Sequence, residues 1–214
     1  MTPASVSWIE DRTQSMTATS SDTTEGGNIT LMNLTTSSQT GRWAGYMGNL
    51  TGNLVLADDA GNNFFRWNWY LTEEAIICAG TFTRYNWSAL YEGIVWSVDV
   101  AWGFSGGSDL AIYTFNATQG QLSLNISTNE LTNMNSSDTG GPDPADDDDF
   151  LTSVVNDQAV DNTDKRNILF CTQTNSTGTN NAYDGTTADY ELIVPVGDSS
   201  PSDRETYYFF VELK

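Results

Sequence analysis

Residues 41–71 read GRWAGYMGNLTGNLVLADDAGNNFFRWNWYL, and this stretch decides the fold class. Apolar and polar residues alternate on both sides of residues 58–62, a DDAGN segment with a glycine available for a turn with positive φ. The alternation predicts two strands, Leu50–Ala57 and Asn63–Leu71, joined as an antiparallel hairpin. Three of the seven tryptophans lie here, at positions 43, 67 and 69. We expect their side chains to pack between strands; the alternative is an aromatic platform that binds carbohydrate.

Short strand-like segments, separated by Gly, Asn, Asp and Ser turns, continue along the chain at the spacing of a β-sandwich. The further expected strands are Ala75–Phe82, Gly93–Phe104, Asp109–Phe115, Gln121–Ile126, Asn167–Gln173, Tyr190–Val196 and Thr206–Leu213. Phe150–Val155 fits a short helix or a strand. Because the last expected strand is apolar on both faces, it should lie inside the structure. The sequence predicts an all-β fold, an antiparallel β-sandwich of immunoglobulin-like or jelly-roll-like type.

Composition divides the chain into an arm and a domain. Residues 1–40 are rich in Thr and Ser, with short apolar pieces at Val6–Ile9 and Ile29–Leu34. They predict an extended N-terminal arm with one or two strands. Residues 41–214 have the length of a single sandwich domain. Within it, residues 127–149 are polar, acidic and interrupted by Pro and Gly, so we expect an exposed acidic loop.

Charge and residue content exclude several functions. The 214 residues include 28 acidic and 8 basic side chains, a net charge of −20 that repels nucleic acids and anionic membranes. No run of about 18 apolar residues is present, so we expect no membrane insertion. Histidine is absent, which removes the commonest general base. Carboxylates near tryptophans, such as Glu73, Glu74, Glu92 and Asp99, offer pairs for glycoside hydrolysis, but none is singled out, and we expect no enzyme.

The two cysteines, Cys78 and Cys171, are both flanked by apolar residues. In a secreted chain they would form one long-range disulfide that joins two strands. The alternative is a pair of buried free thiols.

Glycosylation sequons point to the compartment. Random placement of the 19 Asn and 48 Ser or Thr residues would give roughly four N-x-[ST] sites, and the chain has eight. The acceptor asparagines are Asn28, Asn33, Asn49, Asn86, Asn116, Asn125, Asn135 and Asn175. This excess predicts an extracellular, cell-surface glycoprotein with N-linked glycans. The alternative is a β-protein that is merely rich in Asn and Thr.

The densest acidic run offers a metal site. Its five carboxylates belong to Asp143, Asp146, Asp147, Asp148 and Asp149. Carboxylate oxygens are the ligands that Ca²⁺ prefers, so calcium is the candidate ion. The alternative is a solvated loop, because consecutive aspartates rarely converge on one ion. No other cofactor is expected.

Three segments resemble a family of secreted archaeal surface proteins of largely unassigned activity. The first is Trp43–Gly52, WAGYMGNLTG, followed by a hairpin that begins Leu56-Ala57-Asp58 and includes Trp67. The second is the ending TYYFFVEL at residues 206–213, and the third is YDGTTADYELIVP at residues 183–195. The resemblance covers most of residues 41–214. It implies a surface location and a β-rich fold, and it carries over no catalytic residue.

Together these features predict a structural extracellular glycoprotein, the subunit of a cell-surface filament, sheath or coat. Its partners would be identical subunits, joined by β-strand addition from the N-terminal arm. The alternative is a monomeric adhesin or glycan-binding module, which would expose tryptophans in a cleft.

Overall fold

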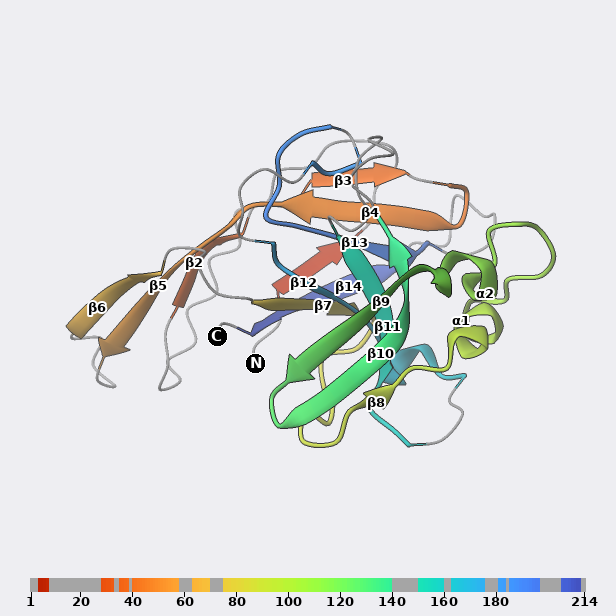
Figure 1. The fold of residues 1–214 in the computed structure, drawn as a ribbon. Helices are drawn as coiled ribbons and strands as arrows, with labels where there is room; N and C mark the ends of the chain where they lie inside the picture. The colour runs from red at the N-terminus through yellow and green to blue at the C-terminus, as the bar shows by residue number, and fades with distance from the viewer. Residues whose placement is uncertain are drawn as a thin grey trace.

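A computed structural model shows three antiparallel sheets. The structure describes residues 4–7, 28–32, 35–38, 40–57, 63–69, 75–139, 150–159, 163–175, 181–183, 185–196 and 205–212. The largest sheet has the order β1-β14-β7-β12-β11-β10-β9, with β8 paired to β11 (Figure 1). Its strands are β1 (Ala4–Ser7), β7 (Ile76–Gly80), β8 (Tyr91–Glu92), β9 (Asn116–Ile126), β10 (Asn129–Asp138), β11 (Leu151–Asn156), β12 (Ile168–Gln173) and β14 (Thr206–Glu212). The expectation of an antiparallel all-β sandwich is confirmed.

A second sheet covers one face of the first. It has the order β13-β4-β3, with β3 (Thr35–Ser38), β4 (Trp43–Gly48) and β13 (Tyr190–Pro195). Trp43 is buried between the two sheets, where its ring meets Phe115 and Phe170 edge-on at centroid distances of 5.3 and 6.3 Å. Tyr46 contacts Phe209 of β14 in the same way. This aromatic layer is the main hydrophobic core, so the prediction that tryptophan packs between strands is confirmed for Trp43.

The opposite face of the large sheet is also buried. Figure 1 shows the β9–β10 hairpin in front of β7 and β12, and Leu124 and Met134 of that hairpin belong to the same apolar cluster as Cys78 and Cys171. The two cysteines are directly opposite each other in the β7–β12 register and form the expected disulfide. Burial on both faces explains why β7 and β12 are continuous apolar runs.

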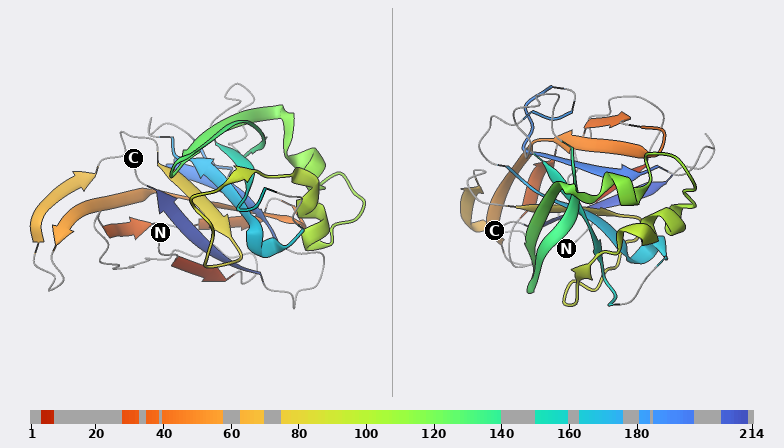
Figure 2. Two further views of the ribbon diagram at one scale, coloured as in Figure 1. Left: turned by 90° about the horizontal axis from the view of Figure 1, so that it is seen from below. Right: turned by 45° about the vertical axis from the view of Figure 1, so that its right-hand side comes forward.

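The third sheet projects from the body. It has the order β2-β5-β6, with β2 (Asn28–Met32), β5 (Leu50–Ala57) and β6 (Asn63–Trp69). The expected hairpin is present, with Leu54 paired to Trp67. Figures 1 and 2 show this sheet at one end of the molecule and the two helices at the other. The side chains of Trp67 and Trp69 lie outside the described part of the structure.

Most of the other expected strands are present, as β7, β9, β12, β13 and β14, and Phe150–Val155 is largely the strand β11. The last strand, β14, lies between β1 and β7, so the prediction that it is internal is confirmed. The expected number of one or two strands in the first 40 residues is wrong: the described part of this segment has three, β1, β2 and β3, which pair with β14, β5 and β4 respectively.

Two expected strands are wrong. Gly93–Phe104 contains the helix α1 (Val95–Trp102), which ends at Gly103 in a left-handed conformation (φ 73°). Its buried Val98 and Trp102 are four residues apart, as one helix face requires, and this spacing prevails over the strand preference of the valines. Asp109–Phe115 contains the single-turn helix α2 (Ala111–Thr114).

The expected acidic loop is wrong in its first half. Residues 129–138 form β10, which joins β9 through a turn at Ser127, a residue with φ of 55°. Leu131 and Met134 are buried, and the polar residues around them are mostly exposed. Residues 140–149 lie outside the described part of the structure.

Candidate functional site

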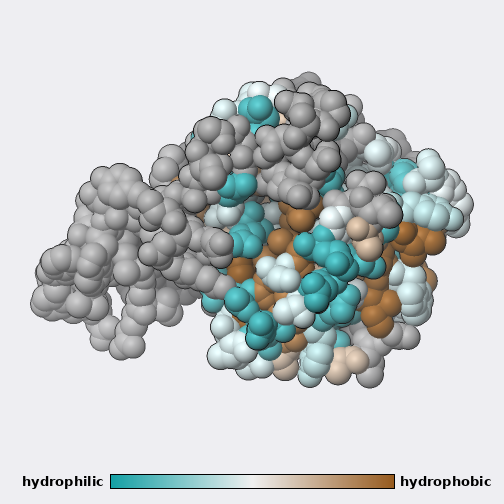
Figure 3. Space-filling view, in the orientation of Figure 1, coloured by the Kyte–Doolittle hydropathy of each residue, from teal (hydrophilic) through white to brown (hydrophobic). Residues whose placement is uncertain are grey.

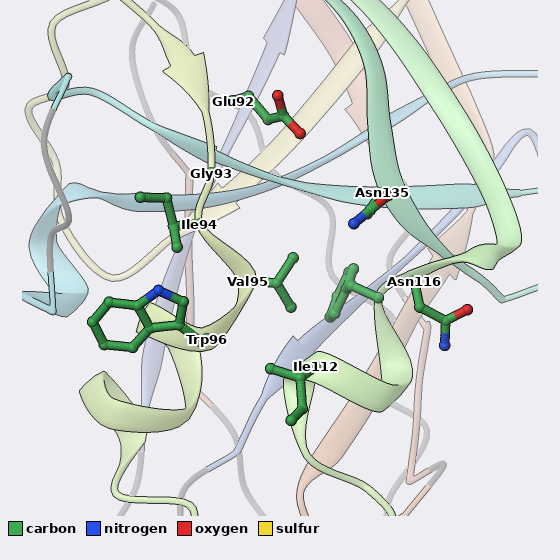
Figure 4. Close-up of a pocket in the computed structure, with 9 residues that line it drawn as sticks. Glu92, Gly93, Ile94, Val95, Trp96, Ile112, Asn116 and Asn135 are labelled. Atoms are coloured by element: carbon green, nitrogen blue, oxygen red, sulfur yellow. The ribbon is translucent and has the colours of Figure 1, made fainter.

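A pocket of about 490 Å³ lies beside the two helices. Its lining comes from β8, α1, α2, β9 and β10: Glu92, Gly93, Ile94, Val95, Trp96, Ile112, Phe115, Asn116 and Asn135. Figure 4 shows Glu92 and Asn135 pointing toward each other above Val95, with Trp96 at the margin beside Ile94. The volume lies within the roughly 300–1,000 Å³ of small-molecule sites.

Gly93 sets the position of the Glu92 side of the pocket. Glu92 pairs with Val155, and the Gly93 N–H donates to the Val154 carbonyl oxygen at 2.9 Å. A Cβ atom on Gly93 would lie only 2.6 Å from that oxygen. Glycine is therefore required for the chain to run this close to β11 before it turns into α1.

A β-bulge sets the opposite side. Asn135 pairs with Gln121, but the next residue, Ser136, pairs with Asn116, so residues 117–120 form an insertion in β9. Gly120 in this insertion has φ of 126°, which a residue with a side chain rarely adopts. Bulges re-aim side chains at sheet edges, and this one brings Asn116 beside the Asn135 end of β10.

The two helices are joined by a buried carboxylate. Asp99 of α1 accepts hydrogen bonds from the backbone N–H groups of Ala111 (2.7 Å) and Ile112 (3.4 Å), at the start of α2. Burial raises the pKa of Asp99, and the two N–H donors partly offset this effect. Asp99 therefore holds the start of α2 against α1.

The first residues of the opening stretch hold the helix unit on the sandwich. Arg42 donates to the carbonyl oxygens of Gly106 (2.7 Å) and Ser105 (3.1 Å) and lies 3.2 Å from the carboxylate of Asp109. The Trp43 indole N–H donates to the Asp109 carbonyl oxygen at 2.8 Å. These contacts fix the loop between α1 and α2, and with it the pocket wall.

Apolar side chains are exposed around the pocket. Trp96 and Ile112 in its lining are 45% and 42% exposed, and the neighbouring Val100 and Tyr113 are 54% and 55% exposed. Figure 3 shows hydrophobic residues gathered at the end of the molecule that carries α1 and α2. The lining has one carboxylate, that of Glu92, and no basic residue. The pocket therefore offers acceptors, amide groups and apolar walls, and it disfavours anions.

The expected glycan carriers lie in several places. Asn49, Asn86, Asn125 and Asn135 are exposed, and Asn116 and Asn175 are half-buried. Asn28 lies in β2, without a described side chain, and Asn33 lies outside the described residues.

The expected calcium ligands, Asp143, Asp146, Asp147, Asp148 and Asp149, also lie outside the described residues. Among the residues described, no three or more of His, Cys, Asp and Glu are grouped as a metal site. In the same part of the chain, no helix has the length and apolar character needed to cross a membrane.

Comparisons of the chain with protein-family models, with curated proteins and with solved structures give no match. The resemblance to secreted archaeal surface proteins therefore stays a prediction. From the sequence, Glu92 is a candidate carboxylate, Asn135 a sequon asparagine and Trp96 one of seven tryptophans that could stack on a sugar, but no pattern groups the three in one pocket. Gly103, a glycine at the end of a run with helical spacing, was the available signal for α1.

Proposed function

We propose that this protein is a structural subunit of an extracellular filament, sheath or coat, assembled by strand exchange at the edge of its large sheet. The observation that carries the proposal is the pairing of β1 with β14. β1 is an edge strand of four residues, in register from Ala4 with Phe209 to Ser7 with Thr206. If β1 moved to a neighbouring subunit, a neighbour's β1 would fill the vacated place with the same main-chain hydrogen bonds.

Strand β14 has the properties of an acceptor. Tyr207, Phe209 and Phe210 are fully buried and belong to the cores on the two faces of the sheet. Without β1, this core strand would present unpaired backbone groups at the sheet edge, which is a template for another chain. A strand supplied by a neighbour would satisfy those groups and hold the two subunits together.

The connection to β1 is long enough for exchange. Residues 8–27 separate Ser7 from β2, and a fully extended chain covers about 3.3 Å per residue, so these residues can span up to about 66 Å. The projecting β2–β5–β6 sheet offers a further surface for a neighbouring subunit (Figure 2). The disulfide and the exposed sequons support an extracellular setting.

Cross-linking between two variants that each add one cysteine to the native Cys78–Cys171 pair tests the exchange. Ser7→Cys and Thr206→Cys occupy paired positions, so a mixture of the two variants should give a disulfide-linked dimer on non-reducing gels. The matched control pairs Ser7→Cys with Glu212→Cys, at the far end of β14, and should give no dimer. Negative-stain microscopy of native material should show filaments or sheets.

Cross-links confined to one chain would contradict strand exchange. If the Ser7→Cys/Thr206→Cys double variant links only within one chain, and the mixture of single variants stays monomeric over a range of salt and calcium concentrations, β1 belongs to its own subunit and strand exchange is wrong.

A further inference from the structure

We infer that the pocket between β8, the two helices and the β9–β10 hairpin binds a neutral saccharide. This role goes beyond assembly, because no pocket residue belongs to β1 or β14. The inference depends on the groups that meet in the pocket, and it holds whether or not strand exchange occurs.

The polar groups suit hydroxyl ligands. The Glu92 carboxylate can only accept hydrogen bonds, while the Asn135 amide can accept and donate. Figure 4 shows these two groups facing each other across the pocket from β8 and β10, and the Asn116 amide pointing away. The Asn116 amide donates to the Tyr113 carbonyl oxygen at 2.5 Å, which accounts for its direction. A sugar ring between Glu92 and Asn135 could donate hydroxyls to one and exchange hydrogen bonds with the other.

The apolar groups suit the C–H faces of the same ring. Val95 lies at the centre of the pocket, Ile112 lies on the α2 side, and the indole of Trp96 is exposed at the margin (Figure 4). Aromatic faces with exposed apolar area contribute strongly to binding because they lose little conformational entropy. Combined with two polar groups on one side, they select a ligand with a polar edge and an apolar face.

Charge excludes the competing ligand classes. A phosphate or uronate would meet Glu92 with no basic side chain in the lining, on a chain of net charge −20. A quaternary ammonium ligand is recognised by several aromatic faces, and here only Trp96 offers an exposed ring in the lining. A neutral saccharide satisfies both the polar and the apolar walls.

The saccharide has two sources. Asn116 and Asn135 are sequon asparagines, and the bulge pairs Asn116 with Ser136, next to Asn135. An N-glycan on Asn135, whose amide faces the pocket, would place sugars there. The other source is a glycan on another molecule. In both cases Glu92 would accept hydrogen bonds from sugar hydroxyls, and Trp96 would pack against the C–H face of the ring.

Titration of protein made in a host without N-glycosylation tests the site. The probes are N-acetylglucosamine, galactose, mannose and chitobiose, with choline and inorganic phosphate as charged comparisons. Saturable binding of at least one neutral sugar should be seen by tryptophan fluorescence and saturation-transfer NMR. Trp96→Ala and Glu92→Gln should each weaken it at least tenfold. Tyr183→Ala, which removes an aromatic side chain of similar exposure outside the pocket lining, should leave it unchanged.

Glycosylated material distinguishes the sources. If peptide mass spectrometry finds glycan on Asn135, and acrylamide quenches the fluorescence of Trp96 only after deglycosylation, the ligand is the protein's own glycan. If Asn135 is bare and added sugar binds, the ligand is external. The inference is overturned if no probe sugar binds, if choline or phosphate binds in its place, or if binding survives both Trp96→Ala and Glu92→Gln in folded variants.

Discussion

Reduction of the Cys78–Cys171 disulfide should destabilise the protein through its unfolded state. The two cysteines are 93 residues apart in sequence, and the chain-entropy relation for a closed loop of this size gives about 4.7 kcal/mol of stabilisation. Since whole domains are stable by only about 5–15 kcal/mol, this one bond accounts for a large share of the folded state's margin.

Equilibrium unfolding in urea measures the effect. With an m-value of about 2.5 kcal/mol/M, a loss of 4.7 kcal/mol lowers the unfolding midpoint by about 1.9 M. Comparing oxidised with reduced wild-type protein keeps every side chain in place, so the difference isolates the cross-link. The Cys78→Ala/Cys171→Ala variant should lose more, because both cysteines are buried in the core under the β9–β10 hairpin.

A small stability difference between the oxidised and reduced protein would refute the loop-entropy explanation. If the free energies of unfolding of reduced and oxidised wild-type protein differ by less than about 1 kcal/mol, residual structure in the reduced unfolded chain already holds β7 near β12. The loop-entropy argument would then not apply. If the alanine variant and the reduced protein are equally stable, the burial of the sulfur atoms contributes nothing.

Two further predictions concern the pocket wall and acid stability. Gly93→Ala should lower the free energy of unfolding in urea by about 2–3 kcal/mol, because the added Cβ would overlap the Val154 backbone, and it should also weaken saccharide binding. The control is Gly103→Ala, where a Cβ meets no atom within 4 Å; it should cost less stability and leave saccharide binding intact. Asp189, just before β13, accepts a hydrogen bond from the Leu50 N–H at 2.8 Å. Burial raises the pKa of Asp99 and of Asp189 above 3.8, so at pH values between 3.8 and the raised pKa values the folded protein binds more protons than the unfolded chain. The contribution of these two carboxyls to the free energy of unfolding therefore falls as pH rises through that range. The urea unfolding midpoint should rise on acidification from pH 7 toward pH 4, and Asp189→Asn should make this rise smaller.

The disulfide and the internal position of β14 could be predicted from the sequence because both depend on local runs of apolar residues. Cys78 and Cys171 each sit in such a run, and a strand that is apolar on both faces has to be covered twice. The helices could not be predicted in the same way. The segment of α1 alternates as a strand does. Gly103 at its end is a weak helix signal, and the packing of Val98 and Trp102 against the core decides between the two periods.

The pocket depends on long-range geometry that no local pattern contains. Glu92 and Trp96 are close in sequence, but Asn135 lies near them only because β8 and β10 both pair with β11. The glycines of the site could be read as turn signals from sequence, yet the close approach of Gly93 to β11 appears only once the sheet order is known.

The order of the large sheet explains how one chain could serve both proposed roles. β1 and β9 are its two opposite edges, so strand exchange at the β1 edge leaves the pocket at the β9 edge uncovered. Two sequon asparagines, Asn116 and Asn125, lie on β9 itself, and Asn125 is exposed. Glycans there would block edge-to-edge pairing, a standard hazard of an open strand. The β1 edge would then be the only one of the two open to other subunits, which gives the assembly a direction and keeps the saccharide site on its surface.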